Sequence, residues 1–379
     1  MFRKRYDILT VAGIKIGIDI SWFFIAVLIA WTLAAFYFPS LYHNLTAATY
    51  WFMGILGMLG LFVCVVLHEL GHAAVAKYYK LPISQITLFL FGGIAEIKKE
   101  PTSAKSEFLM AIAGPLVSFI LAGFLYLLTR GGLLWGWSVA VTGVTGYLAL
   151  INLLLALFNL LPAFPLDGGR VLRAILWGWK KNLGWATDVS TRLGSAFGYA
   201  LMFLGIFILF SHNFLAGFWL IILGWFLHHA ATAMRSQFYV GKELGSEKVV
   251  KFMKENPISV APTVSIREFV DHYVYQSHHH LYPVTQEGKL LGYISLKEVK
   301  TLAQDEWGKT TVQKIMIPKG QFQTASPDTS ALDALNLMQE SDSGALLVVS
   351  DEQLVGILTA QDLFKVISLK LELEEEQRR

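Results

Sequence analysis

Residues 65–79, VVLHELGHAAVAKYY, place two histidines and a glutamate at the end of a long apolar stretch. The residues that lead up to them, 51–67, carry no charged side chain. Ionisable groups are costly to place in hydrocarbon, so those found in a membrane segment usually serve a function. The pattern predicts a membrane-spanning helix with a functional site at one end.

The composition divides the chain into two parts. Overall, 54% of the residues are hydrophobic and 16% are charged, whereas a soluble domain has about 25% charged residues. Long apolar runs fill residues 1–236, and the composition after residue 240 is that of a soluble domain. We therefore expect a polytopic α-helical membrane protein followed by a soluble α/β module. The single cysteine, Cys64, excludes an intrachain disulfide and a cysteine-rich metal site.

Six segments are long and apolar enough to span a bilayer, which takes about 20 residues. They lie near residues 17–38, 50–76, 108–129, 135–161, 188–210 and 214–234. Seventeen lysines and arginines fall on one side of these spans and only Arg130 falls on the other. Because basic residues concentrate in cytoplasmic loops, we expect a multi-pass protein of the cell membrane with both termini in the cytoplasm.

The motif HELGH suits a catalytic metal. On a helix, His68 and His72 project from the same face one turn apart, and Glu69 lies beside them. Imidazole nitrogens bind Zn²⁺, and a catalytic zinc has three protein ligands and one open position. The alternative, two surface histidines beside a glutamate, would leave three ionisable groups at the end of an apolar run without a purpose.

A third ligand is expected from the segment NLLPAFPLDGGRVLRAI, residues 159–175. His68 lies about 25 Å of helical rise from Trp51, near the inner end of the second span. Asp167 follows the inner end of the fourth span, which runs in the same direction. The two motifs should therefore lie at a similar depth. Asp167 is also suited to cap the helix that follows it, either in place of the ligand role or together with it.

HELGH followed by NLLPAFPLDGG (159–169) resembles the site-2 protease family of intramembrane zinc metalloproteases. GIKIGIDISWFF (13–24), FGGIAEI (91–97) and AIAGPLVSF (111–119) are similar to further family segments, although Ser118 stands where many members have asparagine. The resemblance implies one zinc per chain, regulated intramembrane proteolysis and a single-span membrane protein as substrate. It assigns zinc binding to His68, His72 and Asp167, general base and acid catalysis to Glu69, and oxyanion stabilisation to Asn159.

The β-prone segment LFLFGGIAEI (88–97), with Gly92-Gly93 as its turn, matches the family's membrane-associated strand. We expect it to bind an unwound substrate by strand addition. Alternatively, it forms a small hairpin that only covers the active site.

The soluble part, after a linker at residues 237–248, contains two copies of one unit, at about 249–306 and 310–370. It resembles a tandem pair of CBS domains. LVGILTAQDL (354–363) carries the family's ribose-contacting Thr359 and Asp362, whereas LLGYISLKEV (290–299) has Glu298 in place of the aspartate. The resemblance implies ATP, ADP or AMP as a regulator. Alternatively, the pair is a dimerisation module without a ligand.

Two functions from different classes remain open at this point. The first is an intramembrane zinc protease regulated by nucleotide or by homodimerisation of the CBS pair. The second is a catalytically silent scaffold or transporter whose soluble part senses energy status. Metal-ligand spacing, topology and depth favour the protease, and no feature of the sequence specifies a transport pathway. Nucleic acid is not expected as a partner, and substrate identity cannot be inferred from the sequence.

Overall fold

The computed structural model describes residues 5–11, 13–89, 92–97, 101–211, 214–277, 279–341, 344–363 and 365. The chain forms two compact units, Met1–Ser236 and Gln237–Arg379.

Within the described residues, six helical segments of the first unit are long and apolar enough to cross a membrane, which confirms the predicted membrane architecture. The first, Ile20–Leu41, joins α1 (Ile20–Thr32), a π-helical segment (Leu33–Tyr37) and α2 (Phe38–Leu41). The others are α3 (Ala47–Tyr78), α4 (Ala104–Leu134), α5 (Val139–Asn159), α7 (Leu183–Phe210) and α8 (Phe214–Ser246). A shorter amphipathic helix, α6 (Asp167–Lys180), lies between α5 and α7 in sequence.

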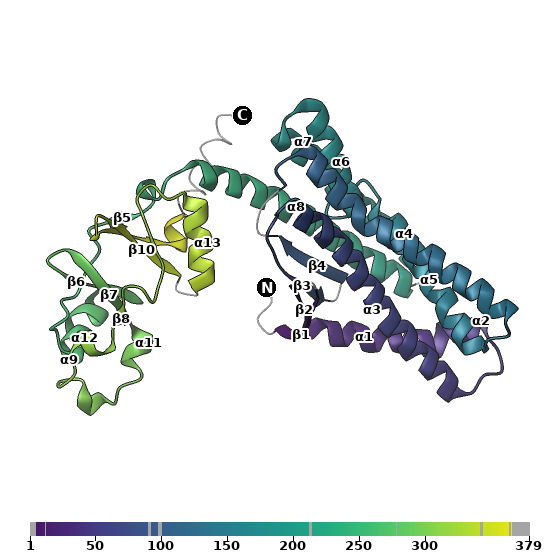
Figure 1. Cartoon of the computed structure of the whole chain (residues 1–379), viewed down its shortest axis with the longest axis horizontal. Helices are drawn as coiled ribbons and strands as arrows, with labels where there is room; N and C mark the ends of the chain where they lie inside the picture. Colours follow the sequence, from purple (N-terminus) through teal and green to yellow (C-terminus); the bar gives the residue numbers. More distant parts are fainter. Residues whose placement is uncertain are drawn as a thin grey trace. The chain divides into compact units, whose positions relative to one another are not determined.

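Local sequence and small side chains explain how these helices begin and pack. The Thr46 side chain accepts a hydrogen bond from the Thr49 amide at the start of α3, and Ser103 and Ser106 form a capping box at the start of α4. A Cβ atom at Gly54 of α3 would lie 2.7 Å from the Ala30 carbonyl oxygen of α1. Close backbone approach at small residues is typical of membrane helices. Helices α3, α4 and α5 pack side by side, and α6 packs against α4 and α7 (Figure 1).

A four-stranded sheet accompanies the membrane helices. Its strands β1 (Arg5–Val11), β2 (Ile14–Asp19), β3 (Ile83–Phe89) and β4 (Gly92–Ile97) are ordered β1-β2-β3-β4. Strands β2 and β3 are parallel, and β3 and β4 are antiparallel. The prediction that Gly92 and Gly93 form a turn is wrong, because they pair with Phe89 and Leu88 as the first residues of β4. Leu90 and Phe91 lie outside the described residues.

The second unit has the repeated α/β architecture expected of a CBS pair. Its described strands form one sheet with the order β6-β7-β11-β10-β9, in which β5 pairs with β11 and β8 with β7. The strands are β5 (Lys254–Glu255), β6 (Leu281–Gln286), β7 (Lys289–Ser295), β8 (Ile317–Pro318), β9 (Thr324–Ala325), β10 (Ala345–Ser350) and β11 (Gln353–Thr359). The helical segments are α9 (Ile266–Phe269), a π-helical segment (Val270–Val274), α10 (Tyr275–Ser277), α11 (Leu296–Val299), α12 (Val312–Ile315) and α13 (Ala331–Ser341).

The segment expected to be a linker, 237–248, is helical through Ser246 as the continuation of α8. Leu244 is fully buried and belongs to the same hydrophobic cluster as Leu346 and Leu358. Val240, one helical turn before Leu244, packs against the same cluster. The polar residues between and after them conceal this apolar face in the sequence. The last part of the second copy, after residue 365, lies outside the described residues.

Candidate metal centre

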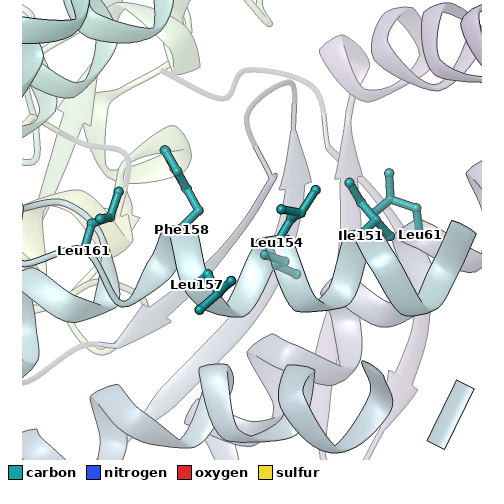
Figure 2. Close-up of a pocket in the computed structure, with 7 residues that line it drawn as sticks. Leu61, Ile151, Leu154, Leu157, Phe158 and Leu161 are labelled. Atoms are coloured by element: carbon teal, nitrogen blue, oxygen red, sulfur yellow. The ribbon is translucent and has the colours of Figure 1, made fainter. Parts of the chain in front are cut away.

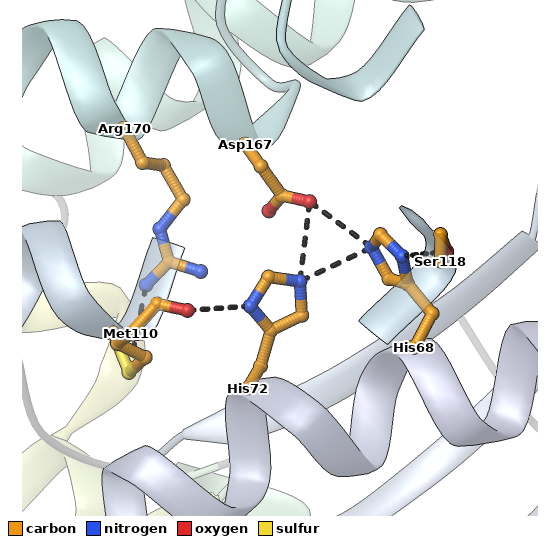
Figure 3. Close-up of polar contacts among 6 residues, drawn as sticks. All are labelled: His68, His72, Met110, Ser118, Asp167 and Arg170. Carbon is orange, nitrogen blue, oxygen red and sulfur yellow. Dashed lines mark hydrogen bonds and ion pairs between the residues drawn. The ribbon is translucent and has the colours of Figure 1, made fainter. Parts of the chain in front are cut away.

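His68 and His72 of α3 and Asp167 of α6 come together in a buried cluster (Figure 3). Asp167 Oδ2 lies 3.1 Å from the Nε2 atom of each histidine, and the two Nε2 atoms are 3.2 Å apart. The two histidines are each 4% exposed and Asp167 is 9% exposed. Among the described residues, these three form the group that could hold a metal ion.

The outer ring nitrogens of the histidines are held by α4. The Nδ1–H of His72 donates a hydrogen bond of 2.7 Å to the Met110 carbonyl oxygen, and His68 Nδ1 lies 2.9 Å from the Ser118 hydroxyl oxygen. A carbonyl oxygen can only accept, so the neutral His72 ring carries its proton on Nδ1 and presents a lone pair at Nε2. That lone pair faces the oxygen of a carboxylate. Two acceptors in contact inside a protein require a cation or a further proton between them.

The size and chemistry of the cluster suit zinc. Ligand atoms about 2.0–2.1 Å from a tetrahedral zinc are about 3.3–3.4 Å from one another, close to the distances found here. Two imidazoles and one carboxylate, with a fourth position open, form a donor set of the catalytic type. Hydrogen bonds from the outer nitrogens to a carbonyl and a hydroxyl also match the usual surroundings of zinc-bound histidine.

The carboxyl of Asp167 is held in its ionised form. Burial alone raises the pKa of Asp167, but hydrogen bonds and charge interactions with His68 and His72 outweigh it and bring the pKa below its usual range. At neutral pH the side chain is therefore a carboxylate, the form in which aspartate binds a metal ion. Asp167 is the first residue of α6, and the residue in the N-cap position is Leu166. The cap alternative is therefore wrong, because the side chain points to the histidines instead of the helix terminus.

Glycines allow the close approaches that this site needs. A Cβ at Gly114 of α4 would lie 2.2 Å from His72 Nε2 and 2.6 Å from His68 Nε2. A Cβ at Gly168 would lie 2.2 Å from the Leu160 carbonyl oxygen, so the loop before Asp167 folds directly onto α6. Met110 and Gly114 were not predicted to belong to the site, and Ser118 was predicted only to depart from the family pattern. The segment AIAGPLVSF, which contains Gly114 and Ser118, was the available signal.

Glu69 lies on α3 with the two histidines, whereas Asn159 lies on α5, which carries no candidate ligand. Glu69 follows His68 on α3 and packs against β4, where a Cβ at Gly93 would lie 2.7 Å from Glu69 Cγ. Asn159 is the last residue of α5 and is half-buried. Gly92 lies next to Gly93 at the start of β4. The structure therefore places Gly93 against Glu69.

An apolar groove on the membrane unit is separate from the ligand cluster. It has a volume of about 590 Å³ and is lined by Leu61 of α3, six residues of the α5 region including Leu154 and Phe158, and no polar side chain (Figure 2). None of the three candidate ligands lines it. The groove offers no group for acid, base or metal chemistry.

Thr359 and Asp362 lie together in the second unit. The Thr359 hydroxyl donates a 2.6 Å hydrogen bond to Asp362 Oδ2, and Lys254 Nζ lies 3.0 Å from Oδ1. Burial raises the pKa of Asp362, but these contacts outweigh it and lower the pKa below the usual value. In the first copy, the Ser295 hydroxyl donates to Glu298 in the same way. The longer glutamate thus reproduces the local hydrogen bond of the aspartate.

Comparison with known proteins identifies both units. The sequence model of peptidase family M50 matches residues 56–136 and 135–205, and that of the CBS domain matches 248–304 and 312–369. A protein named as a zinc metalloprotease from Synechocystis sp. is 32% identical over 94% of this chain and 93% of its own length. A zinc metalloprotease from Methanocaldococcus jannaschii is 33% identical over 83% of this chain and 86% of its own length.

The solved structure of the site-2 protease from the same archaeon is 32% identical and covers 61% of this chain and 95% of that chain, with a TM-score of 0.43. The long coverage of the metalloprotease relatives and the family matches agree with the motifs HELGH and PLDGG. The chain belongs to peptidase family M50, the site-2 protease type of zinc metalloprotease, and carries a tandem pair of CBS domains.

Proposed function

We propose that this metalloprotease hydrolyses peptide bonds of single-span membrane proteins within the bilayer, near its cytoplasmic face. The observation that carries the proposal is the buried cluster of His68, His72 and Asp167, whose nitrogen and oxygen atoms lie 3.1–3.2 Å apart. The cluster joins α3, a helix apolar enough to span the membrane, to α6. These three residues are the proposed zinc ligands.

Bound zinc would lower the pKa of a water molecule to about 7 and polarise the scissile carbonyl. The chain's own groups would move the proton. Glu69, adjacent in sequence to His68, is the proposed general base and then the general acid towards the leaving amine. Asn159, which ends α5 eight residues before Asp167, is the proposed amide donor to the developing oxyanion.

We propose that β4 receives the unwound substrate, with Gly92 and Gly93 in the binding segment. A helical substrate keeps its peptide groups in internal hydrogen bonds, so it has to be extended before hydrolysis. Strand β4 is the last strand in the order of its sheet, and Gly93 lies against Glu69. A substrate added as a further strand would therefore run close to the proposed base. The competing role, a hairpin that only covers the site, would not require main-chain pairing with substrate.

The orientation follows from charge. If the six spans alternate in direction, seventeen lysines and arginines of residues 1–248 would lie on the side of the two termini and the start of α6, and only Arg130 on the other. The positive-inside rule therefore supports cytoplasmic termini in the cell membrane.

For the CBS pair we propose regulation by ATP, ADP or AMP, bound through Thr359 and Asp362, or by homodimerisation. A carboxylate beside a hydroxyl is a suitable acceptor for ribose hydroxyl groups. Lys254 occupies one oxygen of that carboxylate, so a nucleotide would compete with this ion pair or rearrange it.

The first experiment measures zinc content and cleavage of a single-span substrate with purified protein. Wild type should contain about one zinc per chain, and His72→Ala should lose both zinc and cleavage. Glu69→Gln should keep zinc and lose cleavage, because the ligands remain and the base does not. Turnover by Glu69→Gln at the wild-type rate would overturn the mechanism. Zinc-free wild type after preparation in excess zinc would favour the scaffold or transporter alternative.

A further inference from the structure

A buried ion pair joins α4 and α6 close to the metal centre. Arg173 of α6 is 4% exposed and Glu107 of α4 is fully buried. The Arg173 Nε–H donates a hydrogen bond of 2.5 Å to Glu107 Oε1, and an Nη group contacts the same oxygen. Glu107 lies one helical turn before Met110, the hydrogen-bond partner of His72. The pair thus connects the helix that orients the histidines to the helix that begins with Asp167.

Arg173 also holds the loop that leads into Asp167. Its guanidinium carbon lies 5.2 Å from the centre of the Phe164 ring, in a cation–π contact. The backbone of Phe164 also packs closely against Gly169 and against Gly194 of α7. A Cβ added at Gly169 would lie 2.4 Å from the Phe164 nitrogen, and one added at Gly194 would lie 2.1 Å from the Phe164 oxygen. Phe164 is three residues before Asp167 and 2% exposed.

Stability alone does not explain why a charged pair, Glu107 and Arg173, is buried between α4 and α6. Replacing a buried ion pair with apolar side chains of similar volume is often neutral or stabilising, so burial of charge is weak evidence for a role in stability. Here two nitrogens of a planar guanidinium contact one carboxylate oxygen, and a charge-assisted hydrogen bond of this kind fixes direction as well as distance, unlike an apolar contact. A metal site depends on such direction, because ligand positions matter to within about 0.2 Å.

We propose that Glu107 and Arg173 are positioning residues for the metal centre. The ion pair holds α6 against α4, and the guanidinium holds Phe164, so that the Asp167 carboxylate stays within reach of both histidines. This role rests on the proposed function of His68, His72 and Asp167 as metal ligands. Neither Glu107 nor Arg173 touches the metal or the substrate in this role.

The test compares two variants of the full chain with wild type. Arg173→Met alone removes the guanidinium from the buried carboxylate of Glu107 and should unfold at a lower temperature. The double variant E107Q/R173M removes both charges, so its thermal unfolding should return towards that of wild type. Its zinc affinity, measured by competition with a chelator, should remain lower by about 10- to 100-fold. The absorption spectrum of its Co²⁺-substituted form should also differ from wild type, because the ligand geometry has changed.

Arg173→Lys gives an independent test if the double variant does not fold. Lysine keeps the positive charge beside Glu107. It lacks the planar guanidinium that contacts the Phe164 ring and binds Glu107 through two nitrogens. We expect near-normal thermal unfolding, at least a threefold loss of zinc affinity and an altered Co²⁺ spectrum. Wild-type affinity and an unchanged spectrum in Arg173→Lys would overturn the proposal.

A matched control uses the ion pair between Asp188 of α7 and Arg235 of α8, helices that carry no proposed ligand. D188N/R235Q should keep wild-type zinc affinity and the wild-type Co²⁺ spectrum. Equal metal binding by wild type and E107Q/R173M would overturn the positioning role alone. Absence of metal from wild type would overturn the proposed function and the positioning role with it.

Discussion

Gly114 is the residue on which the shape of the metal centre depends most directly. At Gly114 the backbone of α4 passes beside the imidazole rings of His68 and His72. The space between its Cα and the rings admits a hydrogen atom but no methyl group. We expect Gly114→Ala to lower zinc affinity at least 100-fold, because the new methyl group would lie 2.2 Å from His72 Nε2 and 2.6 Å from His68 Nε2 and would displace both rings. Equilibrium competition for zinc with a chelator measures the loss.

Gly123→Ala is the matched control, since it makes the same substitution on the same helix. A Cβ at Gly123 would meet no atom within 4 Å. Alanine favours a helix over glycine by about 1 kcal/mol in soluble hosts, so this variant should bind zinc as wild type does. Equal zinc affinity in Gly114→Ala and wild type would contradict the geometry of the site.

Asp362 makes a pH-dependent contribution to the stability of the second unit. Its pKa is lowered in the folded state, so its stabilising effect is complete above the unfolded value of about 4 and is lost as the pH falls through the folded pKa. The difference in unfolding free energy between wild type and Asp362→Asn should therefore be larger at pH 7 than at pH 3. Urea unfolding of residues 237–379 at several pH values measures it, and a difference that grows towards acid pH would contradict the assignment.

At the scale of elements, the apolar runs predicted the six spans. The spacing of HELGH predicted that His68 and His72 lie on the same face of one helix. The strands β1 and β2 were not predicted. Strand β2 pairs in parallel with β3, from Lys15 with Gln85 to Ile18 with Leu88, and no local periodicity reveals a contact between segments so distant in sequence. The roles of Met110 and Ser118 were missed for the same reason. Both contacts arise from the packing of α4 against α3, and the segment AIAGPLVSF marks a family resemblance without specifying which side chains meet.

The contact between β4 and α3 gives a prediction at this scale. A methyl group at Gly93 would press on the side chain of Glu69, at 2.7 Å from its Cγ, and would displace either the strand or the proposed base. We expect Gly93→Ala to reduce the cleavage rate at least tenfold and to leave the zinc content at one per chain, because the ligands lie on other elements. Zinc analysis alongside a cleavage assay separates these effects. Wild-type cleavage would show that β4 does not need to lie against Glu69 during catalysis.

At the scale of the whole molecule, the change in composition near residue 236 predicted the division into two units, and the internal repeat predicted the CBS pair. Composition did not predict the structure of residues 237–248. Their polar side chains predicted a linker, whereas the segment continues α8 through Ser246 and buries Leu244 in a cluster that reaches Leu346 and Leu358. Such a role becomes apparent only when the core around it is known.

Regulation through the second unit gives the last prediction. If adenine nucleotide binds through Thr359 and Asp362, wild-type cleavage should change when ATP or AMP is added, and Asp362→Asn in the full chain should respond at least tenfold more weakly to a given concentration. Loss of a hydrogen bond to a charged group costs about 1.5–3 kcal/mol, which supports that magnitude. Glu298→Gln, at the corresponding position of the first copy, is the control and should respond as wild type does. A full response in Asp362→Asn would exclude this carboxylate, and loss of response in Glu298→Gln alone would assign regulation to the first copy.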